Sequence, residues 1–361
     1  MAQAIPEHLH RILDLARWAP SGDNTQPWRF EILGDEHILV HGFDTRDHTV
    51  YDLDGHASQL AVGALLETIA IAATGEGRQA RISRRPDTPD AHLLIDVNFE
   101  PDASLAQDSL IPSITKRVVQ RRPMSTQSLT QAQKVALEGA LPDGYRVRWF
   151  EGLPQRWRLA RFMFDNAKVR LIIPEAYEVH RKVIEWGAQF SEDKIPSQAV
   201  GVDSFTARFM HWAMADWGRV EILNTWFLGD LPPRIQLDLL PGLACAAHFS
   251  LFAPAALNSS DDYLSAGRVM QRFWLTAASK GLYVQPEMTP VIFTRYHRHG
   301  LRFTQQGRAY AMVESLNRRL AKLMGGPRAA ETLFFIGRMG SGPSPKARST
   351  RRSLDQLILT G

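Results

Sequence analysis

The sequence has a single cysteine, Cys245, in 361 residues. One cysteine excludes an internal disulfide framework, so a reducing compartment fits the chain. The N-terminal segment is charged and amphipathic and lacks the apolar core of a signal peptide. No uninterrupted apolar run approaches the ~20 residues that a membrane helix needs. These absences predict a cytoplasmic protein with no membrane segment.

Several well-known site motifs are also missing. The sequence contains no P-loop, HExxH or GxSxG pattern. Residues 75–80 match GxGxxA, but they follow a predicted helix, whereas the dinucleotide fingerprint follows a strand. The pairs His8/His10 and His297/His299 have no cysteine or acid at metal-ligand spacing, so no metal site is predicted. No acid–base dyad is evident, and catalytic residues are left unassigned.

Positive charge is present but concentrated. The formal net charge is +4, and two basic clusters stand out: Lys116, Arg117, Arg121 and Arg122, then Lys346, Arg348, Arg351 and Arg352. A nucleic-acid reader usually has a larger basic stripe or a recognisable motif, so no nucleic-acid partner is predicted. Two interpretations remain. The clusters are solvated surface, or they hold a small phosphorylated ligand, which needs only two or three arginines.

Hydrophobic periodicity predicts an α+β protein with mixed or antiparallel sheets. Helices are predicted at 5–18, 57–74, 130–140 and 262–279. Strands are predicted at 28–33, 37–41, 78–83, 92–99, 145–150, 247–253 and 333–337. The polar connector 101–112 is the best candidate for a boundary between two halves.

The two halves resemble each other. Residues 63–77 align with 267–281, pairing Gly63 with Gly267 at an offset of 204 (267 − 63), and the apolar positions between the glycines keep step. Upstream, helix, turn and strand at 5–33 mirror helix, turn and strand at 130–150. Two such matches in the same order favour an internal duplication.

Residues 19–30, APSGDNTQPWRF, resemble the APSxxNxQPWxF motif of the nitroreductase family. That family binds FMN between two subunits, and the resemblance implies that Pro20, Ser21, Gly22, Asn24 and Gln26 shape the site of the flavin ring. A tight turn lets the backbone approach a planar ring closely. Asn and Gln can contact the ring edge or can simply brace the turn.

Three further segments resemble the same family. Residues 116–123 are similar to its arginine segment, which implies that Arg117 and Arg121 meet the FMN phosphate and the pyrimidine edge. Val119 stands where the family has a serine. The basic tail resembles the closing phosphate-binding pattern, but its register leaves Arg348, Arg351 and Arg352 open. The turn after the second core helix, with Gln285, Pro286 and Glu287, is expected to face the flavin.

These motifs are divided between the halves. The first half, 1–105, has the Pro-Ser turn and no arginine segment. The second half, 106–361, has the arginines and tail but no such turn, and carries insertions at about 155–245 and 296–330. The distribution predicts a fused pseudo-dimer with one FMN. This arrangement resembles tandem nitroreductase-like proteins, such as Acg-like proteins and the nitroreductase half of E1-like fusion proteins.

The resemblance implies an FMN-dependent oxidoreductase that transfers hydride at flavin N5 and acts on a small organic or biosynthetic substrate. NAD(P)H is a candidate reductant, and a monomer or weak homodimer is expected. The alternative is a flavin-binding or flavin-sequestering protein with a covered site and little turnover. The insertion at 155–245 is either a lid over the flavin, with Trp212 and Trp217 setting access, or an extension of the core.

Overall fold

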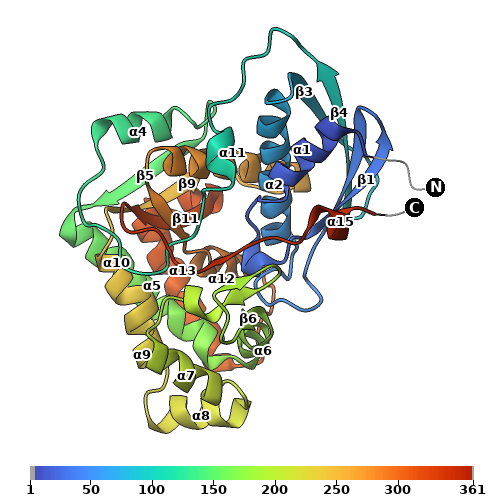
Figure 1. Ribbon diagram of the computed structural model, residues 1–361. Helices are drawn as coiled ribbons and strands as arrows, with labels where there is room; N and C mark the ends of the chain where they lie inside the picture. The colour runs from blue at the N-terminus through green and yellow to red at the C-terminus, as the bar shows by residue number, and fades with distance from the viewer. Residues whose placement is uncertain (1–4, 360–361) are drawn as a thin grey trace.

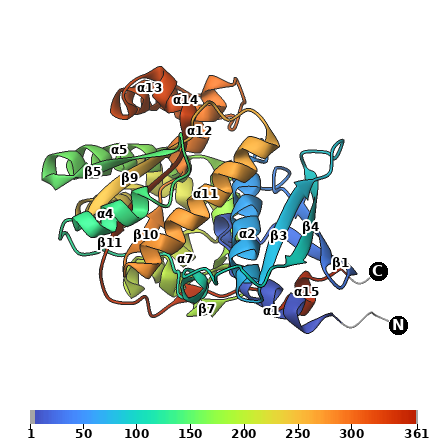
Figure 2. The same cartoon turned by 90° about the horizontal axis from the view of Figure 1, so that it is seen from above.

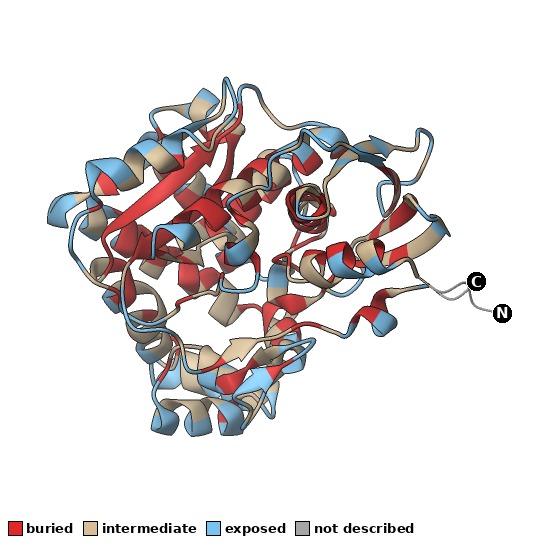
Figure 3. Ribbon diagram, turned by 45° about the horizontal axis from the view of Figure 1, so that its top comes forward, coloured by how far each residue is buried: buried red, intermediate tan, exposed pale blue. Residues whose placement is uncertain are grey.

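The computed structural model describes residues 5–359. Two four-stranded antiparallel sheets lie on either side of a central pair of long helices, α2 (His56–Thr74) and α11 (Ser260–Ser279), as Figures 1 and 2 show. Figure 3 shows that buried residues concentrate on these two helices and on the inner faces of the sheets. The predicted α+β class with antiparallel sheets is confirmed.

The first sheet is built from the first hundred residues. Its order is β1-β2-β4-β3, with bounds β1 (Trp28–Gly34), β2 (His37–Phe43), β3 (Arg78–Arg84) and β4 (His92–Pro101). β4 alternates buried and more exposed residues, as expected for a sheet with one covered face. α1 (Glu7–Ala16) buries Leu9, Ile12, Leu13 and Ala16 in the core that the sheet shares with α2.

The second sheet is assembled from more distant segments. Its order is β5-β9-β11-β10, with bounds β5 (Arg146–Glu151), β9 (Ala247–Phe252), β10 (Tyr283–Pro286) and β11 (Leu333–Gly340). All residues of β9 and β11 are buried, because helices or loops cover both faces. α4 (Gln131–Glu138) begins at Thr130 with a capping box, in which the Thr130 and Gln133 side chains each bond the other's backbone N–H.

The two sheets have the same topology. Each unit runs helix, strand, strand, long helix, strand, strand, and the final two strands pair so that the last lies inside the sheet. β5, β9, β10 and β11 thus correspond to β1, β2, β3 and β4. Every pairing in both sheets is antiparallel. The arrangement agrees with the repeat expected from the sequence.

The central helices cross at the two glycines that head the sequence repeat. A Cβ on Gly63 would lie 2.2 Å from the Leu264 carbonyl oxygen, and a Cβ on Gly267 would lie 2.2 Å from the Leu60 carbonyl oxygen. Leu60 and Leu264 are themselves 204 residues apart (264 − 60), so the contact is unchanged when the helices are exchanged. Only glycine permits this backbone approach.

Two polar contacts across the helix pair are also interchanged when the two helices are exchanged. The Arg272 Nε donates to Glu67, and the Gln271 amide donates to the Thr68 hydroxyl at 2.9 Å. These bonds and the glycine contact join the halves along α2 and α11. Among residues 5–359, α2 is the one helix that is long and apolar enough to cross a membrane, and 83% of its apolar window is buried inside the protein.

Two insertions enlarge the second half. The first follows β5 and contains four main helices: α5 (Gly152–Ile172), α6 (Pro174–Val183), α7 (Ser204–Ala213) and α8 (Trp217–Trp226). It closes with the short turns α9 (Leu231–Arg234) and α10 (Leu240–Leu243), on either side of η3 (Ile235–Leu239). The second insertion holds α12 (Thr289–Arg298), α13 (Gly307–Met324) and α14 (Pro327–Thr332), which share a core with α5.

The C-terminal tail returns to the first half. Residues 341–353 cross the molecule and end in α15 (Leu354–Leu357), whose Leu354 and Leu357 are buried against the first core (Figure 1). Ile358 forms a parallel bridge with Phe30, and the Leu359 N–H donates to the Phe30 carbonyl at 2.7 Å. The tail therefore covers the outer edge of β1.

Candidate functional site

The Pro-Ser turn after α1 has an unusual backbone. Asp23, Asn24 and Gln26 have φ angles of 49°, 63° and 50°, in the left-handed region that non-glycine residues seldom adopt. The Ser21 hydroxyl accepts a hydrogen bond from the Gln26 N–H at 3.0 Å and holds the turn closed. Observed strain of this kind commonly marks a functional site.

Asn24 and Gln26 bind protein carbonyls. The Asn24 amide donates to the carbonyls of Glu192 at 3.0 Å and Thr350 at 3.3 Å. The Gln26 amide donates to the Glu192 carbonyl at 2.8 Å, and its oxygen accepts from the Arg352 N–H at 3.0 Å. Both residues thus brace the turn, which was one of the two roles expected for them. Contact of either with the flavin ring stays a prediction.

Three arginines from distant segments converge at the end of α1. The Arg117 guanidinium donates to the Trp18 carbonyl at 2.8 Å, and Arg351 donates to the Ala19 carbonyl at 3.0 Å. Arg348 lies over the Trp18 ring at 4.9 Å and donates to the carbonyls of Thr115 and Arg117. We call Arg117, Arg348 and Arg351 the arginine cluster.

The arginine cluster has no paired acid among the described residues. Burial, and then the charges of Arg351 and Arg348, hold the pKa of Arg117 well below its usual range. Burial, with Arg348 and Arg17 nearby, lowers the pKa of Arg351 to about 9. The Nε atoms of Arg117 and Arg348 are buried without a hydrogen-bond partner. A bound dianion would neutralise such buried cations and accept hydrogen bonds from their free donors.

The sequence did not show which of the tail arginines lies near Arg117, and the structure gives the position of each. Arg348 and Arg351 point into the cluster, whereas the Arg352 side chain lies 3.4 Å from Asp193, outside it. Arg17, which sequence reasoning did not select, lies 5.5 Å from the Trp18 ring and pairs with Asp14 at 2.7 Å. Its position directly before the Pro-Ser turn was the available signal.

Arg121 occupies a different place from Arg117. It donates to the Ala199 carbonyl at 3.2 Å and lies in the electrostatic range of Asp23, Arg338 and Arg170. Burial, only partly opposed by Asp23, lowers the pKa of Arg121 to about 10. The arginine segment therefore places one cation in the cluster and another beside the turn. Between them, Val119 forms a parallel bridge with Val284 of β10 and supplies no hydroxyl.

Residues 283–286 differ from the sequence expectation. They form strand β10, paired with β11, and not a turn. The Gln285 amide donates to the Pro286 carbonyl at 2.8 Å, while its buried oxygen has no partner. The alternation of apolar and polar residues over four positions is too short to identify such a strand from sequence, and the preceding Gly281 favoured a turn.

Glu287, at the end of β10, belongs to a buried charge network. It accepts from the Arg338 guanidinium at 2.8 Å and bonds the His248 Nδ1 at 2.8 Å. Burial opposes the charge on His248, but Glu287 and then Cys245 favour it, and the resulting pKa is about 10. His248 Nε2 lies 2.8 Å from the Gly242 carbonyl, so a protonated ring can donate from both nitrogens.

The same network also contacts the backbone of Arg121. Arg338 donates its second terminal nitrogen to the Arg121 carbonyl at 2.9 Å. His248, Glu287 and Arg338 therefore connect three strands to the arginine segment. Sequence reasoning selected Glu287 for its backbone near a flavin, whereas its side chain is committed to this network.

The first insertion adds polar groups near the turn. Arg170 bonds Asp238 at 2.9 Å, and the Tyr51 hydroxyl lies 2.8 Å from His180 Nε2. Burial, and then the charge of Arg170, lower the pKa of His180 to about 3, so its ring is neutral beside the Tyr51 hydroxyl. Burial raises the pKa of Asp23, against the opposing charges of Arg121 and Arg170. No pattern in the sequence linked these residues.

The segment that covers the turn lies inside the insertion expected at about 155–245. Residues 189–199 contact Asn24, Gln26, Arg121 and the tail, and β7 (Phe190–Ser191) pairs with β12 (Arg348–Ser349). Trp212 is 52% exposed on α7 at the outer end of the insertion, where it packs on Phe209 and Arg219. Trp217 packs on Tyr177. The lid role of Trp212 and Trp217 stays a prediction, because these contacts show where the two side chains pack and not what they gate.

No group of three or more potential metal ligands occurs among residues 5–359. The arrangement instead joins a strained turn, a charge-deficient arginine cluster and a sheet-bound arginine segment within an α+β fold with repeated topology. An arginine cluster of this kind, where the segments 17–26, 116–121 and 348–351 meet, is typical of a site for a phosphorylated ligand. Residues 5–191, a little over half of the chain, match the model of the nitroreductase family, and the chain belongs to that family.

Relatives share only part of the chain. Over 150 residues it is 33% identical to "Uncharacterized protein Rv3127" of Mycobacterium tuberculosis, which covers 40% of this chain and 44% of that protein. Over 120 residues it is 32% identical to Rv3131 of the same organism, named provisionally as an NAD(P)H nitroreductase, covering 33% and 35%. The chain thus matches less than half the length of these curated relatives.

A solved structure with a similar fold is the FMN-dependent nitroreductase NfnB of Mycobacterium smegmatis. It is 13% identical, with 69% of this chain and 96% of that chain covered, at a TM-score of 0.37. A nitroreductase-like protein of Bacillus cereus is 11% identical, covering 72% and 98%, at a TM-score of 0.35. These likenesses do not carry the assignment, which rests on the family match.

The residues present fit FMN, the cofactor of this family. A phosphate would meet the free Nε donors of Arg117 and Arg348 in the arginine cluster. Arg121, beside the turn, would supply positive charge for the ring end. The structure thus has one positively charged region that suits the phosphate of FMN and another that suits its ring.

Substitution of Arg338 tests how the ring end is held. Arg338→Lys keeps the charge, but a lysine cannot bridge the Glu287 carboxylate and the Arg121 carbonyl with a planar fork. We expect FMN and riboflavin affinities to fall together, by roughly tenfold for the loss of about 1.4 kcal/mol. Flavin fluorescence titration measures both constants, and thermal melting reports stability. A loss confined to FMN would show that Arg338 acts on the phosphate end.

Proposed function

We propose that the protein is an FMN-dependent oxidoreductase that passes hydride from a reductant, NAD(P)H, to a small organic acceptor. The observation that carries the proposal is the arginine cluster at the Pro-Ser turn, where buried guanidinium groups lack an anion. Family membership supplies the enzyme class. The provisional name of the relative Rv3131 supports NAD(P)H as the reductant.

FMN supplies hydride transfer at its N5 when bound. The protein's residues would then bind and orient it: Arg117, Arg348 and Arg351 hold the phosphate, and Arg121 places positive charge at the pyrimidine edge. Such a charge favours the anionic reduced ring. Asp23, whose pKa is raised by burial, lies in the electrostatic range of Tyr51, which is bonded to His180, and would hold a proton at the turn.

We further propose that the chain is an internal pseudo-dimer with one flavin site. The repeated topology and the symmetric glycine contact support two related halves, 1–105 and 106–361. The Pro-Ser turn comes from the first half, and the arginine segment comes from the second. Insertions separate the strand pairs of the second half at 152–246 and 287–332, close to the expected 155–245 and 296–330.

One flavin per chain is the expected stoichiometry, because only one complementary set of motifs exists. The protein is saturated with FMN, freed of excess ligand and denatured with acid, and the released flavin is quantified against protein. A ratio of about one is expected from the single arginine cluster. A ratio near two would contradict the single-site arrangement.

Reduction kinetics test the enzymatic proposal. The FMN-loaded protein is mixed anaerobically with NADPH or NADH, and flavin bleaching is followed by stopped flow. Nitroaromatic and quinone acceptors are then added in turn. Reduction followed by acceptor-dependent reoxidation supports the oxidoreductase.

A second candidate function is flavin sequestration with little turnover. It is favoured by the segment 189–199, which is bonded to Asn24, Gln26 and Arg121 and lies across the turn. Such a cover restricts access from that side. Tight FMN binding without reduction by either nicotinamide would select this function.

A further inference from the structure

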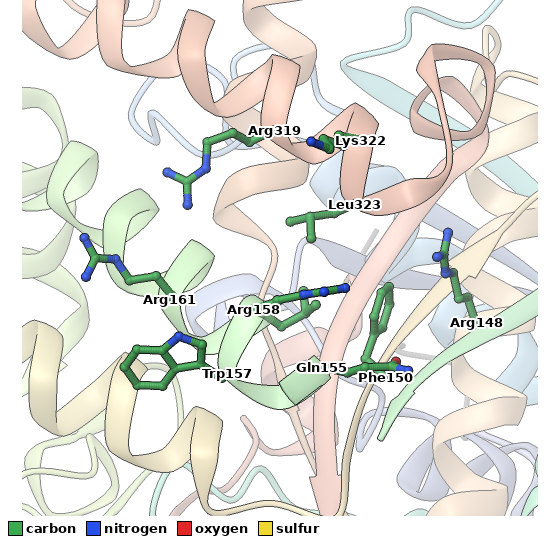
Figure 4. Close-up of a pocket in the computed structure, with 10 residues that line it drawn as sticks. Arg148, Phe150, Gln155, Trp157, Arg158, Arg161, Arg319, Lys322 and Leu323 are labelled. Atoms are coloured by element: carbon green, nitrogen blue, oxygen red, sulfur yellow. The ribbon is translucent and has the colours of Figure 1, made fainter. Parts of the chain in front are cut away.

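A basic pocket, separate from the arginine cluster, lies between β5, the first turns of α5 and the end of α13 (Figure 4). It has a volume of about 620 Å³, within the ~300–1,000 Å³ common for small-molecule sites. It shares no residue with the arginine cluster. Arg158 in the pocket and Arg170 near the turn are twelve residues apart on α5 (170 − 158), roughly 18 Å along the helix axis.

The pocket is strongly cationic. Five of the residues that line it are positively charged, and none is acidic: Arg148, Arg158, Arg161, Arg319 and Lys322. Asp165 pairs with Arg161 at 3.3 Å and with Arg319 at 2.9 Å, so one carboxylate serves two of them. Among the described residues, Arg148, Arg158 and Lys322 have no ion-pair partner. Three uncompensated cations around one concavity favour a multiply charged anion.

An apolar surface accompanies this charge. Phe150 and Leu159 are buried residues of the lining, and Leu323 lies below α13 (Figure 4). Trp157 is 49% exposed at the rim, on the same helix as Arg158 and Arg161. An exposed indole beside cations can stack a planar ring while the cations bind phosphates. A solvated charged surface alone would not need an apolar lining.

We propose that this pocket binds a nucleoside polyphosphate. Its phosphates lie against Arg148, Arg158 and Lys322, and its base packs on Trp157. The concave shape and the single exposed aromatic residue favour a small ligand over an extended nucleic acid, which uses a continuous basic stripe. The site is independent of the flavin, so its existence does not depend on the proposed redox function.

Calorimetric titration of the FMN-saturated protein tests the proposal. The probes are ATP, tripolyphosphate and adenosine, used at low salt without magnesium. Saturation with FMN removes the arginine cluster as a competing phosphate site. We expect ATP to bind with a Kd below about 100 µM. Tripolyphosphate should bind more weakly, and adenosine should not bind measurably.

Variants locate the binding. Arg158→Gln with Lys322→Gln should weaken ATP binding at least tenfold, because two charge-assisted contacts are lost. The matched control, Arg308→Gln with Arg318→Gln, removes two exposed charges from α13 outside the pocket and should leave it unchanged. Trp157→Leu should weaken ATP but not tripolyphosphate. Thermal melting confirms that each variant is folded.

Three results would overturn the proposal. The first is no heat of binding with 1 mM ATP, a concentration about tenfold above the expected Kd. The second is equal losses in the pocket variant and its control, which would place the nucleotide elsewhere. The third is tighter binding of a single-stranded oligonucleotide than of ATP, which would make the surface a nucleic-acid site.

Discussion

Replacement of Arg117 by alanine is expected to weaken FMN binding tenfold or more and to leave riboflavin binding nearly unchanged. Arg117 is buried, and its Nε has no partner, so a phosphate would meet it away from competing water. A hydrogen bond to a charged group is worth about 1.5–3 kcal/mol, or roughly tenfold to more than a hundredfold in affinity. Fluorescence titration with the two flavins gives the two dissociation constants.

Lys116→Ala provides the matched control. Lys116 precedes Arg117 in the same basic segment, but it is exposed and outside the arginine cluster. Its removal lowers the net charge by the same amount and should change FMN affinity little. The rise in Tm caused by saturating FMN should shrink in the Arg117 variant and persist in the control. Equal losses for FMN and riboflavin would show that Arg117 does not contact the phosphate.

Gly63→Ala is expected to destabilise the protein by about 3 kcal/mol or more, the upper part of the range for overpacked cores. The added Cβ would lie 2.2 Å from the Leu264 carbonyl oxygen, and that atom belongs to a helix backbone that cannot rotate away. The helices must separate, which loosens the packing between the halves. Differential scanning calorimetry should show a fall in Tm of several degrees.

Two companion variants make this result specific. Gly267→Ala should have a similar effect, since its Cβ meets the Leu60 carbonyl oxygen at the same distance. Gly307→Ala is the control: it lies at the start of α13 with nothing within 4 Å of the added carbon. Alanine is favoured over glycine in helices by roughly 0.5–1 kcal/mol, so this change should be neutral or stabilising. An unchanged Tm for Gly63→Ala would contradict the close helix crossing.

Much of the framework was predictable because local patterns decide it. α2 follows from a segment rich in alanine and leucine, α11 from an apolar stripe at helical spacing, and seven of the strands from short apolar segments bounded by turn residues. The glycine pair Gly63 and Gly267 was visible as an offset in the sequence, and it lies at the helix crossing. The arginines were recognisable through a family resemblance, since no local rule brings Arg117 and Arg351 together.

The rest depends on contacts between distant segments. Arg170, Asp238 and His180 reach the neighbourhood of the turn because α5 and α6 fold back, and no short pattern records that path. The choice of Arg348 and Arg351 over Arg352 depends on how β12 pairs with β7. For the same reason the sequence did not show which part of the insertion at 155–245 lies over the turn: its tryptophans drew attention to α7, whereas backbone carbonyls of residues 189–199 form the contact.

The returning tail has a consequence for biosynthesis. Arg348 and Arg351 lie near the end of the chain, yet they complete a cluster around Trp18 near its start. Under the proposed function, the chain up to Arg351 must therefore leave the ribosome before the arginine cluster can hold a phosphate. A product truncated before residue 348 would lack two anion ligands and would also leave the edge of β1 uncovered. Such an edge can pair with another chain, so incomplete copies would tend to aggregate.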